Sequence, residues 1–125
     1  MLFLHFVESE LFSLQLGRAL NAAAAEHGQR YDQGGAEAWG LTGASYLGFA
    51  LCGLSSAQLR DIQYRTREQF GPVILDCKWY DDLKKECLKG QEAIDALLPG
   101  PNGTTHLCHI TDQLFLEMLD FCREG

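Results

Sequence analysis

The chain has 125 residues, which suits one domain and is too short for two separate cores, so residues 1–125 are expected to fold as a single domain. Apolar residues make up 46% and charged residues 22%, a composition that excludes a disordered or fibrous chain. The formal net charge of -7 argues against nucleic acid and anionic membranes as partners, and it leaves a basic or neutral protein as the expected partner.

The N-terminal segment is apolar but lacks the features of a signal peptide. Residues 1–7 have no basic n-region, and Glu8 and Glu10 follow at once without a small-residue cleavage site. Residues 38–54 reach only the minimum length for a bilayer span and contain four glycines, so no transmembrane helix is expected. Five cysteines, odd in number and mostly set in apolar patterns, are typical of reduced thiols in a cytoplasmic protein.

The first half of the chain begins with a short apolar run at residues 1–7, which predicts a buried strand. Helical spacing starts after Ser9, a plausible N-cap, and stops at Gly28; its apolar stripe comprises Phe12, Leu16, Ala19, Leu20, Ala23 and Ala24. Residues 36–54 fit either one glycine-rich buried helix or a turn followed by a strand at residues 46–54. Because each glycine costs a helix about 1 kcal/mol relative to alanine, we favour the strand.

The next two elements have clearer boundaries. Ser55 or Ser56 is expected to cap an amphipathic helix, and Gly71-Pro72 is expected to end it. The residues that recur at helical spacing on its inner side are Leu59, Ile62, Thr66 and Phe70. Apolar and mixed side chains alternate over residues 73–80, which predicts a half-exposed strand.

Three elements are expected in the last third of the chain. Asp81 or Asp82 is expected to cap a helix whose apolar stripe runs from Leu83 through Ile94 to Leu98 and stops at Pro99. A tight turn at residues 99–103 precedes a strand at residues 104–111. Asp112 then caps a final helix, built on Leu114, Phe115, Met118, Leu119 and Cys122.

This order predicts about four strands alternating with four helices. Because each helix can serve as a crossover between parallel strands, the predicted fold is a small single-domain α/β sandwich with a mixed or mostly parallel sheet. The half-exposed strand at residues 73–80 leaves an antiparallel or α+β arrangement open.

Motifs for catalysis and cofactor binding are weak. The segment GASYLG at residues 43–48 resembles the G-x-S-x-G nucleophile elbow, but its second glycine comes one residue late and a strand is expected where the elbow needs a helix. Neither G-x-x-x-x-G-K-[ST] nor G-x-G-x-x-G occurs, so no phosphate-binding loop is predicted. We therefore expect no cofactor.

His106, Cys108 and His109 have the density of a metal site. Successive side chains on a strand point to opposite faces, so His106 and Cys108 share one face while His109 lies on the other. A zinc site would need Cys52 or Cys77 brought beside them, and no CxxC or HxxxH pair anchors one. Core thiols and a hydrogen-bonded histidine are the better interpretation, and no metal is expected.

The acidic excess is concentrated at the C-terminal end, where residues 90–125 carry six acids against Arg123 alone. On the final predicted helix, acidic residues recur at intervals of three and four and form one exposed stripe, Glu117, Asp120 and Glu124, with Leu116 beside it. Many solvated helix faces have this composition. A docking surface for a basic protein is the functional interpretation.

The favoured function is a small acidic, non-enzymatic binding protein that occludes a basic or neutral protein partner, as an immunity- or antitoxin-type inhibitor or an adaptor would. Trp79, Tyr80 and Leu116 are the candidate anchors beside the acidic stripe. The alternative is a small enzyme or ligand-binding domain with a pocket at the carboxyl ends of the strands. Cys77 or Cys108 would then be the nucleophile and His5 the base.

Overall fold

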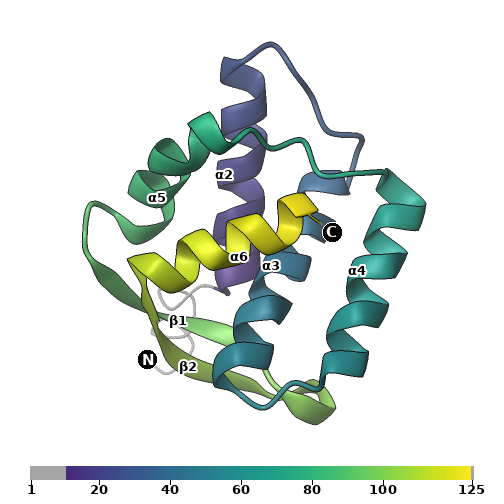
Figure 1. Ribbon diagram of the computed structural model, residues 1–125, viewed down its shortest axis with the longest axis vertical. Helices are drawn as coiled ribbons and strands as arrows, with labels where there is room; N and C mark the ends of the chain where they lie inside the picture. The colour runs from purple at the N-terminus through teal and green to yellow at the C-terminus, as the bar shows by residue number, and fades with distance from the viewer. Residues whose placement is uncertain (1–10, 125) are drawn as a thin grey trace, which may run out of the picture.

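The computed structural model describes residues 11–124, and this part of the chain is mostly helical (Figure 1). Its five α-helices are α2 (Phe12–Glu26), α3 (Gly35–Leu51), α4 (Ser56–Phe70), α5 (Tyr80–Leu88) and α6 (Asp112–Glu124). One antiparallel hairpin joins β1 (Ala93–Pro99) and β2 (Thr105–Thr111). The predicted four-strand α/β sandwich is therefore wrong. The strand predicted at residues 1–7, and the predicted cap Ser9, lie outside the described residues.

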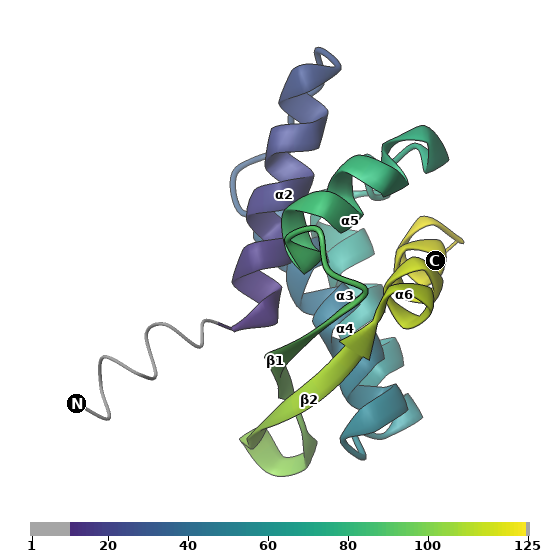
Figure 2. The same ribbon diagram turned by 90° about the vertical axis from the view of Figure 1, so that its left-hand side faces the viewer.

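Helix α3 occupies the centre of the molecule and packs against α2, α4, α6 and β1 (Figures 1 and 2). The strand favoured at residues 46–54 is therefore wrong. Two glycines explain why: a Cβ at Gly40 would overlap the carbonyl oxygen of Ser13, and one at Gly48 would overlap that of Pro99. The close packing that these glycines allow offsets their low helix propensity. No helix within residues 11–124 has the length and apolar character needed to cross a bilayer.

Helix α4 and the C-terminal end of α2 confirm their predictions because these end signals are local. Helix α2 begins at Phe12 with Leu11 as its N-cap, so the predicted cap Ser9 is wrong. Gly28, at φ 72°, terminates α2, and the amide of Gln29 donates to the carbonyl of Ala24 over 2.8 Å in the manner of a Schellman motif. Ser55 and Gln58 form a reciprocal capping box at the start of α4. Gly71, at φ 76°, ends α4 as expected.

Between α4 and β2 the structure differs from the prediction. Residues 73–76 are irregular rather than a strand, and the carbonyl of Ile74 accepts a 2.6 Å hydrogen bond from the Tyr31 hydroxyl instead of from a neighbouring strand. Asp76 then accepts from the Lys78 amide and starts a short 3-10 turn, η1 (Cys77–Trp79), that leads into α5. Asp81 and Asp82 lie in the first turn of α5, whose N-cap is Trp79.

The helix predicted to continue to residue 98 ends at Leu88, where Lys89 adopts the left-handed conformation. The residues beyond form β1, which pairs with β2 from Ala93 opposite Thr111 to Pro99 opposite Thr105. The predicted tight turn at residues 99–103 is confirmed, and so is the strand predicted at residues 104–111, which is β2. Thr111, and not Asp112, caps α6, because its hydroxyl accepts from the Leu114 amide over 3.2 Å.

Candidate functional site

Helix α6 carries the predicted acidic residues and lies across the front of the molecule (Figure 1). Its buried side chains pack toward α3 and α5; they are Phe115, Met118, Leu119 and Cys122. Because those residues fix the helix rotation, Glu117, Asp120 and Glu124 are all exposed on the outer side. We call this surface, together with Leu116 and Tyr80, the acidic face.

Tyr80 connects α5 to the acidic face. Its hydroxyl donates a 2.9 Å hydrogen bond to Oδ1 of Asp120. Burial raises the pKa of Tyr80, while a hydrogen bond from Arg123 opposes that rise, so the phenol stays protonated at neutral pH. The same contact raises the pKa of Arg123. The hydrogen bond from Tyr80 therefore orients the Asp120 carboxylate. The nearby Arg123 guanidinium places a cation at the C-terminal end of the face.

The apolar anchors predicted for this surface have different positions. Leu116 is half-buried against the core, with part of its side chain accessible. Trp79 is only 4% exposed and stacks on His27, with ring centroids 4.7 Å apart, so it packs at the start of α5 and offers almost no surface to a partner. Two aromatic residues without a predicted role, Tyr46 and Phe121, lie where α3 meets α6. Their ring centroids are 4.8 Å apart and the ring planes are tilted by 30°. Both are half-buried, next to Glu117, which adds to the rise that burial causes in the pKa of Tyr46.

A shallow hollow of about 360 Å³ lies beside the end of α6, lined by Gln29, Ile74, Leu75, Asp76, Cys77, Trp79 and Arg123. It contains Cys77, the nucleophile proposed for the enzyme alternative. The two histidines of the predicted strand at residues 104–111 are elsewhere: His106 bonds to Thr104 and His109 to Asp95, both on the hairpin at the opposite end of the molecule (Figure 1). The described residues therefore do not bring Cys77 together with either histidine, and His5 lies outside them.

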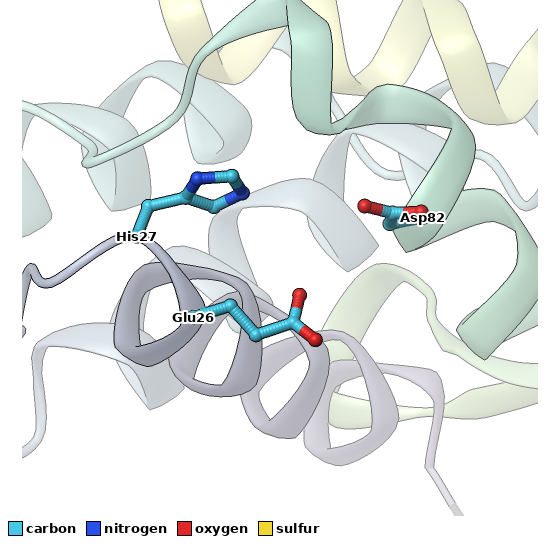
Figure 3. A group of neighbouring side chains, drawn as sticks. All are labelled: Glu26, His27 and Asp82. Carbon is cyan, nitrogen blue, oxygen red and sulfur yellow. The ribbon is translucent and has the colours of Figure 1, made fainter.

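A second cluster joins the end of α2 to the first turn of α5. Ligand atoms of Glu26, His27 and Asp82 all lie within 4.8 Å of one another (Figure 3). One imidazole and two carboxylates are donors that Zn²⁺ or Mn²⁺ accepts. All three side chains are exposed, however, and exposed carboxylates commonly gather without an ion, so we assign no metal to them. Sequence reasoning did not find this cluster because residues from two distant helices form it without a spacing motif.

The cysteines follow two patterns. Cys87 and Cys122 are buried, and burial raises the pKa of each thiol to about 12, which suits the predicted role as core packing. Cys52 lies beside Cys108, as a zinc site would require, but His106 bonds to Thr104 and no metal-ligand group within residues 11–124 includes these thiols.

Comparison with known proteins adds no family: no protein-family model, no curated protein and no solved structure matches the chain.

Proposed function

We propose that this protein is a small non-enzymatic binding module whose acidic face docks a basic segment of a partner protein. The observation that carries the proposal is the exposure of Glu117, Asp120 and Glu124 on one side of a helix whose other side is fully packed. Such a face attracts a cationic partner over long range and raises the association rate. Occlusion of a basic site on the partner, as by an inhibitor or an adaptor, is the mechanism we propose.

Two further features support a docking role. The hydrogen bond from Tyr80 holds the Asp120 carboxylate in place before a partner arrives, which lowers the conformational entropy lost on binding. Half-buried Leu116 and Phe121 offer apolar surface near the carboxylates, and such contacts slow dissociation once charge has guided the encounter.

A first experiment needs no identified partner. Tetralysine is titrated into the full-length ¹⁵N-labelled protein at low salt, with tetraglutamate as the control. We expect the largest amide shift changes at residues 116–124 and none with tetraglutamate. Shift changes centred on Glu26 and Asp82 instead would show that another acidic surface is the stronger attractor of cations, and the proposal would be wrong.

A second experiment tests a real partner. A carbodiimide joins carboxylates to lysine amines, so it covalently captures a basic protein docked on the acidic face. The Kd of the captured protein, expressed alone, is then measured for wild type and for the variant E117K/D120K/E124K. We expect affinity to fall at least about tenfold and the salt dependence to weaken.

The matched control is D32K/E86K/E92K, which makes the same change in net charge at exposed residues outside α6. We expect a small effect for this control. An equal loss of affinity in both variants would mean that net charge, and not the acidic face, drives binding.

A further inference from the structure

Two thiols that are far apart in the sequence meet at the C-terminal end of α3. Cys52 is the C-cap of α3, and Cys108 lies in the middle of β2, opposite Ala96 of β1. Their Sγ atoms are 2.6 Å apart, although 56 positions separate the two residues. Both side chains are half-buried rather than enclosed, so a small oxidant can reach them.

The packing of α3 on the hairpin produces this contact. Gly48 lies directly against the backbone of Pro99, and the Cys52 amide donates to the Gly48 carbonyl over 2.7 Å, so the end of α3 is held at the hairpin. Cys108 shares the inner face of β2 with buried Ile110, because side chains two apart on a strand point the same way. The thiol of Cys108 is therefore directed toward α3 by the same alternation that builds the core.

The other three cysteines are not placed to compete. Cys87 and Cys122 are at most 2% exposed. Cys77 is exposed in η1, the turn that leads into α5, and makes no sulfur contact with another described cysteine. Cys52 and Cys108 thus form the one sulfur pair in contact within residues 11–124.

We propose that Cys52 and Cys108 form a disulfide when the protein meets an oxidising thiol–disulfide pool, and that this bond fastens the end of α3 to the hairpin. One protein thiolate attacks a sulfur of glutathione disulfide, forms a mixed disulfide and releases one glutathione thiolate. The second protein thiol loses its proton and attacks the protein sulfur of that mixed disulfide, releasing the second glutathione. Two electrons pass from the two cysteines to the oxidant, which leaves as two glutathione molecules.

The bond would connect two elements that already touch in the folded protein, so its main effect is to lower the conformational entropy of the unfolded chain. Closing a loop of this length restricts the unfolded ensemble and leaves the folded state nearly unchanged. We expect oxidation to raise Tm by about 10 °C. Burial and the neighbouring Cys108 thiol raise the pKa of the Cys52 thiol to about 12, so Cys52 is a poor attacking thiolate at neutral pH. In a reducing cytoplasm the same residues remain two thiols.

The test compares the full-length protein after incubation with glutathione disulfide and with dithiothreitol. Samples are unfolded and alkylated with N-ethylmaleimide, and their intact mass is measured. We expect five alkylated thiols in the reduced sample and a disulfide-linked form with two fewer alkylation sites in the oxidised one. Digestion with trypsin and a glutamate-specific protease, which cuts between Cys108 and Cys122 at Glu117, identifies the linked peptides.

Variants assign the bond to its two cysteines. C52S and C108S should each lose the linked form and its gain in Tm, whereas C77S should keep both. The linked peptides of the wild type decide the assignment even if a variant fails to fold. Full alkylation after oxidation, glutathione adducts alone, or a bond to Cys77 would each overturn the proposal.

Discussion

Helices α3 and α4 follow one another in the chain and pack together, yet they are stabilised in opposite ways. Ten residues of α3 are buried against its surroundings, and its N-cap, Gly34, makes no side-chain cap. Only Leu59 and Thr66 of α4 are buried, and its support is local: a capping box and an Asp61–Arg65 ion pair. The hydroxyls of Thr42 and Thr66, 3.0 Å apart, join the two helices. A helix can therefore be specified by its neighbours, as α3 is, or by its own sequence, as α4 is.

Filling the contact at Gly48 should destabilise the protein more than the changes at Cys122, Ser55 or Asp61. A methyl group there meets the backbone carbonyl of Pro99, which cannot move aside, so G48A should destabilise the fold by about 2 kcal/mol or more. The matched substitution is G43A, whose methyl would overlap side-chain atoms of Leu16 and Met118 and would lie 3.5 Å from Sγ of Cys122, with no backbone atom among these neighbours. In urea denaturation, the free energy of unfolding of G48A should be well below that of G43A. Equal stability of the two variants would refute the view that backbone contact specifies α3.

The free energy of unfolding should fall at alkaline pH because a buried thiol lies beside α3. Cys122 lies against Gly43, and burial raises the pKa of its thiol from the ordinary 9.0 to about 12. Above pH 9 the unfolded thiol loses its proton while the folded one keeps it, so the free energy of unfolding falls from pH 9 to 12. The loss is about 1.4 kcal/mol per pH unit for one such thiol.

Thermal unfolding between pH 8 and 11 measures this dependence. C122A should show a shallower decline than the wild type, whereas C77A removes an exposed thiol and should leave the slope unchanged. The same slope in all three proteins would mean that the buried thiol beside α3 ionises as freely as in the unfolded chain.

Removal of the cap tests the local support of α4. S55A deletes the oxygen that accepts from the Gln58 amide over 3.1 Å, and we expect a loss of about 1 kcal/mol. S56A, one position later, changes an exposed serine in the first turn and should have little effect. Hydrogen exchange should show the loss mainly in the first turns of α4. A matching loss of protection throughout α3 would contradict the distinction between the two helices.

The smallest change in stability is expected for the exposed ion pair of Asp61 and Arg65, in which Oδ2 of Asp61 lies 3.1 Å from Nε of Arg65. D61N should lower stability by about 0.3 kcal/mol at low salt, because exposed pairs at this helical spacing contribute little. The difference should vanish in 1 M NaCl, where screening is strong. Denaturant midpoints at both salt concentrations check this, and a loss that persists at high salt would point to an interaction other than charge.

Predictions from the sequence succeeded where the signals were local. Gly28 ended α2, Ser55 began α4, and the 3.6-residue spacing of Phe115, Met118 and Cys122 set the buried side of α6. The same spacing placed Glu117, Asp120 and Glu124 together on the exposed side. Their role in binding stays a prediction.

Predictions failed where partners distant in sequence decide the conformation. Residues 94–98 have helical spacing, but pairing with β2 makes them a strand. Residues 73–76 alternate like a strand, but the hydrogen bond from Tyr31 holds the carbonyl of Ile74 in an irregular segment. Trp79 ends an apolar pattern, and only the folded structure, with 4% of the side chain exposed beside His27, shows that it is buried.

Local sequence signals were sufficient for the C-terminal end of α2, both ends of α4, the rotation of α6 and the charge of its outer side, because caps and helical periodicity act within a few residues. The tertiary structure alone decided that glycine-rich residues 35–51 form the central helix, that β1 pairs with β2, and that Cys52 touches Cys108. The physical reason is that close backbone packing, strand pairing and sulfur contact depend on atoms that only folding brings together.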